Sequence, residues 1–194
     1  MSTHPPTFVR TTLDLGDTLL HPWGREPAGP ELLDDLVAAA ADPAIALWNP
    51  LATADHKAAQ TWLESRDNAW NHGTGAAFAA RTTTDGTLLG TVNLRWVDRT
   101  DGLAMIGYWL LPHARGRGLA TRATRAVTTW GFHTADARRI ELAHATGNHA
   151  SCHVAQRCGY LPEGTLRQSH LFGDGTHHDE HLHARLATDP EPHP

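Results

Sequence analysis

Cysteine is scarce in this chain of 194 residues, which holds only Cys152 and Cys158. These two lie in a segment that we expect to be helical, and a spacing of six residues places them about 120° apart around a helix axis. They cannot bridge while that helix is intact, and a disulfide framework is excluded. Unpaired thiols favour a reducing compartment. The first residues also lack the charged-then-apolar pattern of an export signal, so we expect a cytoplasmic location.

Long apolar runs and excess positive charge are missing as well. No run approaches the roughly 20 residues that a membrane-spanning helix needs. The formal net charge is −5, which does not provide the basic field that holds nucleic acid. We therefore expect neither a membrane nor a nucleic acid as a partner. A hydrophobic content of 40% suffices for one core. We expect a flexible N-terminus at 1–10, a single domain at 11–187 and a flexible Pro-rich tail at 188–194.

Histidine is abundant, with 15 residues, and is densest in HHDEHLH at 177–183. His181 and His183 alternate on a segment that resembles a strand, so they share one face. Two interpretations are open: a polar strand edge and a metal site. The sequence lacks HExxH, and its cysteine spacing matches no zinc motif. We expect no metal ion, and a His-rich metal-binding protein stays an alternative function.

Apolar periodicity predicts the order β-α-α-β-β-β-α-β-α-β-β in one mixed α/β (α+β) domain. Strands are expected at 18–23, 76–82, 87–98, 103–111, 138–145, 160–168 and 179–186, and helices at 31–41, from Thr53 or Asp55 to Trp70, at 119–135 and at 150–159. Asp42-Pro43 is expected to end the first helix. The strands between 76 and 111 are separated by hairpin turns, which predicts a three-stranded antiparallel meander.

The run Arg115-Gly116-Arg117-Gly118 stands between the last strand of that meander and the next helix. Backbone N–H groups at a helix start have no intrahelical acceptor, and the macrodipole adds about half a positive charge there. Glycine lets an anion approach these groups, and arginine adds donors. A glycine-rich turn with solvated arginines is the other interpretation. GxxxxGK[ST] and the third glycine of GxGxxG are missing, so neither nucleotide motif fits.

The loop Arg115-Gly116-Arg117-Gly118-Leu119-Ala120 resembles the [QR]xxGx[GA] pyrophosphate loop of the GNAT-superfamily acetyltransferases. Segments 106–121, 148–164 and 175–186 resemble motifs of its RimJ/RimL-like branch, and they stand in the correct order. TLLHPW and DPAIALWNP are similar to its opening strand and first helix exit. The resemblance covers nearly the whole chain. It implies a GNAT-type central mixed, mostly antiparallel sheet of about six or seven strands, flanked by about four helices.

The resemblance also implies an activity, the direct transfer of an acetyl or other acyl group from acyl-CoA to a primary amine. The acceptor would be a small molecule or a protein N-terminus, and the co-substrate acetyl-CoA. The residues implied to hold it are Leu110 and Leu111 through their main chain, Arg115, Gly116, Arg117, Gly118, Leu119, Ala120, Thr121, Asn148 and Ser151. One N–H near Leu110 would face the thioester carbonyl, and a fixed donor of this kind is worth about 10²–10³ in rate.

Individual residues keep two interpretations each. Ser151 stands where the family places a hydroxyl near the sulfur, able to assist the leaving thiolate, but Ser151 and Asn148 are also good helix caps. Tyr160 is expected in the core, with a hydroxyl that reaches the sulfur as the other possibility. Among the seven tryptophans, Trp23 and Trp48 would line the acceptor pocket in such a family.

A proton acceptor is not evident. An amine with a pKa near 10.4 must lose a proton before it attacks. Relatives in the branch often carry Glu in a motif AEIGYW, where this chain has Met105, a thioether that leaves an apolar wall in the pocket. Other candidates are Asp98, Asp101, Glu141 and His144, and none is preferred. A CoA-binding module without catalysis therefore stays an alternative. The sequence does not decide between a monomer and a homodimer.

Overall fold

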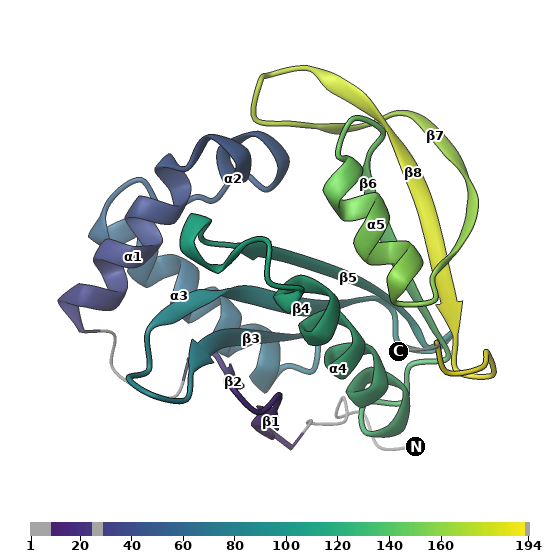
Figure 1. Cartoon of the computed structure of the whole chain (residues 1–194), viewed down its shortest axis with the longest axis horizontal. Helices are drawn as coiled ribbons and strands as arrows, with labels where there is room; N and C mark the ends of the chain where they lie inside the picture. Colours follow the sequence, from purple (N-terminus) through teal and green to yellow (C-terminus); the bar gives the residue numbers. More distant parts are fainter. Residues whose placement is uncertain (1–8, 25–28, 193–194) are drawn as a thin grey trace.

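A central sheet with helices on both faces forms the molecule (Figure 1). The computed structural model describes residues 9–24 and 29–192. The strands are β1 (Leu13–Asp14), β2 (Thr18–Pro22), β3 (Gly75–Thr82), β4 (Leu88–Asp98), β5 (Leu103–Leu110), β6 (Arg139–Ala145), β7 (Leu161–Leu171) and β8 (His177–Leu186). The helices are α1 (Pro30–Ala41), α2 (Pro43–Trp48), α3 (His56–Asn71), α4 (Leu119–His133) and α5 (His149–Arg157), with a 3₁₀ turn at Pro112–Ala114. The mixed α/β architecture is confirmed; the described residues form eight strands and five α-helices, because β1 and α2 were not predicted.

The sheet has the order β1-β2-β3-β4-β5-β6-β8-β7. The predicted meander of β3, β4 and β5 is confirmed, and the remaining neighbours are also antiparallel except β5 and β6, which are parallel. Among the described residues, the pairing of β5 with β6 is confined to Leu103–Met105 against Arg139–Glu141. The two strands separate beyond that point. We call the opening between 106–110 and 142–145 the wedge.

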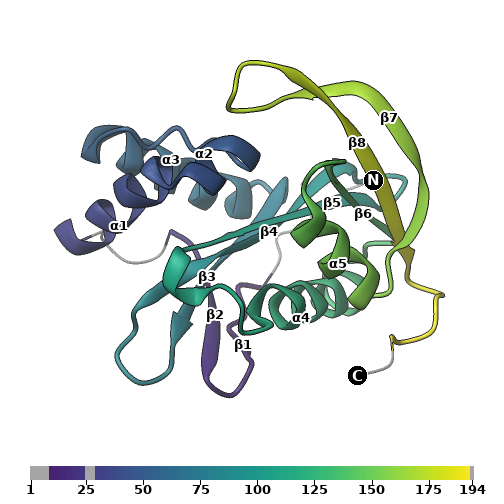
Figure 2. The same cartoon turned by 45° about the horizontal axis from the view of Figure 1, so that its top comes forward.

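Each face of the sheet has its own apolar core. Helices α1, α2 and α3 bury Leu36, Ile45 and Leu63 against one face, together with Trp109 of β5. Helices α4 and α5 pack on the other face, where Val127 belongs to the core cluster. Figure 2 shows the two helical layers on opposite sides of the sheet. The wedge therefore lies between two layers that hold its strands from both sides.

Aspartate caps explain how the first helices begin. The Asp55 carboxylate accepts a hydrogen bond from the N–H of Ala58, so Asp55 caps α3, while the hydroxyl of Thr53 donates to the Leu36 carbonyl. Asp42 caps α2 in the same way. The sequence predicted only that Asp42-Pro43 ends α1. Proline is also favoured in the first turn of a new helix, since its φ is already helical and its missing N–H is not needed there.

Strands β7 and β8 form a long hairpin that reaches beyond the sheet toward α2 (Figure 1). At its tip the Gly173 N–H donates to the Leu47 carbonyl at 3.0 Å. A Cβ at Gly173 would lie 1.7 Å from the carbonyl oxygen of Ala46, so only glycine fits. The ring of Phe172 meets that of Trp48 edge to face, 5.8 Å between centroids. The hairpin is therefore an arch anchored at both ends, and we call it the arch below.

The packed part of the chain includes Arg10, one residue before the expected domain start. Its guanidinium donates to the carbonyl of Trp23 and to the Asp67 carboxylate, the latter at 2.6 Å. Residues 1–8 and 193–194 of the two ends expected to be flexible lie outside the described residues. None of the helices in the described part of the chain is long and apolar enough to cross a membrane.

Candidate active site

The wedge exposes main-chain groups of β5. The Leu111 N–H donates to the Leu89 carbonyl at 2.9 Å, toward β4. Alternation along the strand turns Tyr108 and Leu110 the other way, and their carbonyls accept from Asn49 Nδ2 at 3.3 Å and Arg115 Nε at 3.0 Å. The N–H groups of Tyr108 and Leu110 therefore face the wedge. Of the two leucines predicted to offer their main chain, only Leu110 turns its N–H into the opening.

The glycine loop enters α4 in the left-handed conformation. Gly116 and Gly118 have φ of +76° and +71°, and Gly118 is the N-cap of α4. A Cβ at either glycine would meet nothing within 4 Å, so the space beside them is open. The N–H groups of the first turn of α4, at 119–121, begin at this loop. The structure therefore has the open helix start that an anion needs.

Arg115 does not project into that open space. Its Nε donates to the Leu110 carbonyl, and its Nη2 binds the Asp42 carboxylate at 2.6 Å. The side chain thus links the end of β5 to the start of α2, and its charge is balanced within the protein. Arg117 is exposed. The predicted phosphate contact through Arg115 is therefore not supported by the geometry, and Arg117 is the arginine of the loop that is available to an anion.

The ion pair of Asp42 with Arg115 leads to a prediction about stability. Arg115 and the N–H groups of α2 hold the pKa of the Asp42 carboxyl below its usual value. Asp42→Ala removes both the cap and the ion pair, and we expect a loss of about 1–2 kcal/mol in the free energy of unfolding at pH 7. Asp42→Asn keeps a capping oxygen, so it should cost only about 0.5–1 kcal/mol. Urea denaturation measures both.

The pH dependence of these variants follows from the direction of the shift. A lowered pKa in the folded state means that the stabilisation is complete above the unfolded value of about 3.9 and is lost as the pH falls through the lower folded value. The difference between wild type and Asp42→Asn should therefore shrink below about pH 4. A difference that stays constant down to pH 3 would exclude the Asp42 charge as its source.

Two hydroxyl groups meet across the wedge. Ser151 Oγ of α5 and Tyr108 Oη of β5 form a hydrogen bond of 2.9 Å. The Asn148 side chain caps α5 by accepting from the Ser151 N–H at 3.1 Å, which confirms the capping interpretation for Asn148 and fixes the position of Ser151. Burial raises the pKa of Tyr108 well above its usual value, so its hydroxyl stays protonated and can donate. The sequence did not single out Tyr108.

Tyr160, the other tyrosine, lies in the core. Its side chain is 1% exposed, and its hydroxyl is hydrogen-bonded to Thr128 Oγ1 at 2.6 Å. The core interpretation of Tyr160 is therefore the one that the structure supports. Its hydroxyl is engaged on α4 and is not available to a group in the wedge.

A cavity of about 270 Å³ lies on the α1–α3 side of the sheet. Its walls come from the sheet (Ala77, Thr91, Asn93, Trp109), from α2 and the residues after it (Trp48, Asn49, Pro50, Leu51), from α3 (Trp62, Arg66) and from the arch (His170). Trp48, one of the two tryptophans predicted to line an acceptor pocket, lines this cavity. Trp23 does not: it is 3% exposed, and its Nε1 donates to Thr91 Oγ1 at 2.6 Å, so it supports the wall from behind. Met105 also lies outside the lining and accepts from Arg95 Nη2 through its sulfur at 3.3 Å.

Comparison with known proteins identifies the family of the chain. A family model described as acetyltransferase (GNAT) domain matches residues 25–161. The chain belongs to the GNAT acetyltransferase family. The GNAT chain is 37% identical over 95 residues to YdaF of Bacillus subtilis (strain 168), provisionally named a ribosomal N-acetyltransferase, with 49% of the chain and 51% of YdaF covered. It is 29% identical over 99 residues to a ribosomal-protein-serine acetyltransferase of Escherichia coli (strain K12), covering 51% of the chain and 55% of that protein.

The same fold appears in solved structures of this family. RimL, a ribosomal L7/L12 alpha-N-protein acetyltransferase in complex with coenzyme A, superposes with a TM-score of 0.79 at 19% identity, over 91% of the GNAT chain and 98% of RimL. An identity this low shows the fold alone. In sequence alignment the GNAT chain spans about half the length of the two curated relatives.

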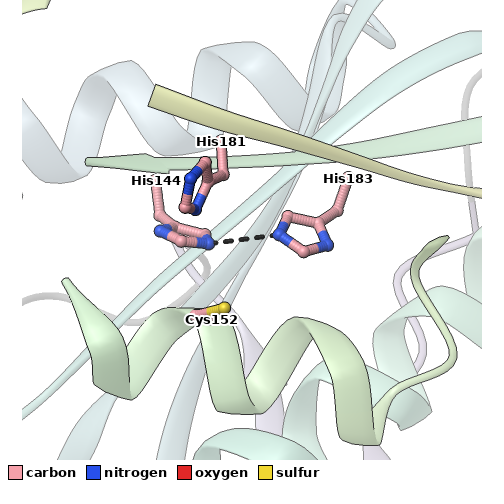
Figure 3. Close-up of side chains that lie close together, drawn as sticks. All are labelled: His144, Cys152, His181 and His183. Atoms are coloured by element: carbon pink, nitrogen blue, oxygen red, sulfur yellow. Dashed lines mark hydrogen bonds between the residues drawn. The ribbon is translucent and has the colours of Figure 1, made fainter. Parts of the chain in front are cut away.

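The four candidate bases, none of which the sequence preferred, lie outside the cavity lining. Asp98 accepts from two N–H groups of its own turn, beside Asp101, and Glu141 is ion-paired with Arg139 at 2.8 Å. His144 lies on the α5 side of the sheet, above α5 in the view of Figure 3. His170 of the arch, which the sequence did not suggest, lines the cavity.

Proposed function

We propose that this GNAT domain transfers an acetyl or other acyl group from acyl-CoA to a primary amine. The observation that carries the proposal is the wedge, with the main-chain donors of Tyr108 and Leu110 and the hydroxyl pair Ser151–Tyr108, together with the open glycine loop at the start of α4. Family membership and the fold shared with a CoA-bound acetyltransferase support it. The open space beside Gly116 and Gly118 fits a diphosphate.

Each part of the wedge has a chemical task in this proposal. The N–H groups at 118–121 hold the diphosphate. The N–H of Tyr108 or Leu110 stabilises the negative charge that forms on the thioester oxygen when the amine attacks. The hydroxyl pair Ser151–Tyr108 donates to the leaving thiolate, and the protonated state of Tyr108 suits this role. His170 accepts the proton of the amine, directly or through water.

The acceptor that fits best is the N-terminus of a protein. The cavity of about 270 Å³ lies under the arch and is large enough for the end of a chain. Its lining contains three tryptophans and Arg66 and no carboxylate, so nothing there selects for the additional positive charge of a polyamine. Relatives with ribosomal-protein names are consistent with this acceptor. We place the reaction in the cytoplasm, without nucleic acid or membrane, in a monomer or homodimer.

The test is a turnover assay with the full chain. We expect acetyl-CoA and a peptide with a free N-terminal serine or alanine to release free thiol, and mass spectrometry to locate the acetyl group on the α-amine. The matched control is the same peptide with a blocked N-terminus and an internal lysine, which should be a poor acceptor. His170→Gln should lower the rate, because the variant has no imidazole to accept the proton of the amine.

Three results of this assay separate the alternatives. Preference for a small amine over every peptide would contradict the proposed acceptor and leave acyl transfer standing. Acetyl-CoA binding without thiol release for any amine would show a non-catalytic CoA-binding module. A pH–rate profile that is identical in His170→Gln and wild type would exclude His170 as the proton acceptor.

A further inference from the structure

Three histidines and a cysteine from three elements meet on the α5 side of the sheet (Figure 3). His144 of β6 and His181 of β8 are direct cross-strand partners, and His183 lies two residues further along the same face of β8. Cys152 of α5 lies below the three rings in this view. Each residue offers one ligand atom, and these four atoms lie within 4.8 Å of one another.

The hydrogen bonds of two rings determine where their protons are. His144 Nδ1 lies 2.9 Å from the Ala145 carbonyl oxygen, and His183 Nδ1 lies 3.4 Å from that of Tyr160. A carbonyl oxygen only accepts, so both Nδ1 atoms carry a proton. In a neutral imidazole the other nitrogen then holds a lone pair. Metal-binding histidines are commonly oriented in this way, by a backbone carbonyl at the second ring nitrogen.

The two lone pairs face each other. His144 Nε2 and His183 Nε2 are 3.3 Å apart, at the nearest edges of rings whose centroids are 5.2 Å apart. With both Nδ1 atoms protonated, both lone pairs are available to a cation that stands beside the two nitrogens. Both rings are held in the protein, with His144 4% and His183 2% exposed.

The spacing matches a tetrahedral ion. Two imidazole nitrogens that bind zinc at about 2.0–2.1 Å are about 3.3–3.4 Å apart when the angle between them is tetrahedral. A nitrogen and a thiolate sulfur at about 2.3 Å from the ion are about 3.6 Å apart. The Nε2 atoms of His144 and His183 already have this separation. The side chains of His181 and Cys152 are partly exposed, and all four ligand atoms already lie within 4.8 Å of one another.

We propose that His144, Cys152, His181 and His183 form a mononuclear site for a divalent transition-metal ion, with Zn²⁺ as the preferred ion. Three imidazoles and one thiolate are a ligand set that Zn²⁺ takes in tetrahedral sites. On binding, the thiol of Cys152 loses its proton to solvent, and the imidazoles bind as neutral ligands. A cavity of about 320 Å³, lined by Cys152, His181 and His183, gives the ion a path.

The ion would connect α5 to β6 and β8. No disulfide connects these elements in the described part of the chain, because both cysteines are free thiols. Cys152 directly follows Ser151, so metal binding would also steady the hydroxyl pair. The proposal does not depend on acyl transfer, because its ligands and its readout are separate from the CoA loop.

The experiment is a metal titration of the full chain without an affinity tag, after treatment with a chelator. We expect calorimetry to show one Zn²⁺ bound per chain. Co²⁺ in its place should give the visible absorption of a tetrahedral ion together with sulfur-to-cobalt charge transfer. Cys152→Ser should remove the charge-transfer band, and Cys152→Ser and His181→Asn should each weaken Zn²⁺ binding at least about tenfold.

Matched controls come from the same region of the chain. Cys158→Ser removes the other thiol, and His153→Asn removes an exposed histidine next to Cys152 on α5; both should bind Zn²⁺ as the wild type does. Circular dichroism confirms folding, and the half-buried positions 152 and 181 are used because replacing the buried rings risks the fold. Zn²⁺ affinity that is unchanged in Cys152→Ser and His181→Asn, or no stoichiometric binding to the wild type, would overturn the site.

Discussion

Gly118→Glu is expected to abolish CoA binding, with an increase in Kd of at least about 100-fold. The backbone at Gly118 has a φ of +71°, which residues other than glycine rarely adopt. The new carboxylate would also stand in the open space where we place the diphosphate. Repulsion between the two anions and the loss of the approach to the N–H groups act in the same direction. Calorimetry with CoA measures the effect.

Gly86→Glu is the matched control for this variant. Gly86 lies in the turn between β3 and β4, has a φ of +74° and, like Gly118, has nothing within 4 Å of an added Cβ. Gly86→Glu therefore introduces the same charge and the same backbone strain at a distance from the glycine loop before α4. We expect the two variants to lose similar stability and only Gly118→Glu to lose CoA. Wild-type affinity in Gly118→Glu would show that the diphosphate binds elsewhere.

Tyr108→Phe is the second variant with a large expected effect, a decrease in kcat of about 10–100-fold, with the KM for acetyl-CoA nearly unchanged. The substitution removes the hydroxyl that is hydrogen-bonded to Ser151 and keeps the ring in place. Stabilisation of a leaving thiolate is needed mainly in the transition state, so its loss lowers turnover and not ground-state binding. Steady-state kinetics of thiol release measure it.

Ser151→Ala and the double variant Tyr108→Phe/Ser151→Ala test whether the two hydroxyls act as one unit. Substitutions of residues that share one hydrogen bond do not have additive effects, so the double variant should be hardly slower than either single variant. Tyr160→Phe is the control, because it removes the hydroxyl of a buried tyrosine bonded to Thr128. It should lose about 1 kcal/mol of stability and keep its kcat. Equal kcat in Tyr108→Phe and wild type would remove Tyr108 from the mechanism.

Local patterns predicted the elements that local physics determines. The meander of β3–β5 followed from alternation and turn residues, and the open loop before α4 followed from the two glycines between that meander and the next helix. Helix α2 was not predicted because its six residues are too few to show helical periodicity. Its only local signal was the pair Asp42-Pro43, which ends one helix and also starts the next.

Contacts between distant residues could not be predicted in this way. Tyr108 and Ser151 are 43 residues apart, and the position of Tyr108 in the wedge depends on where β5 separates from β6. The ion pair of Asp42 with Arg115 likewise joins residues 73 apart, and it redirects an arginine that the motif alone assigned to a phosphate. The histidine cluster depends on the register of β6 with β8, so a search for short metal motifs could not find it.

The arch has a consequence for which amines the cavity accepts. Because the Gly173–Leu47 hydrogen bond closes the hairpin onto α2, the cavity is bordered on the arch side by His170 and on the helical side by Trp48. A polypeptide can reach the cavity between the arch and α2 with its end alone. A lysine in the middle of a folded surface would have to bring two chain segments to the same place. In the proposed function, this topology is expected to favour chain ends as acceptors, before any side chain of the acceptor is recognised.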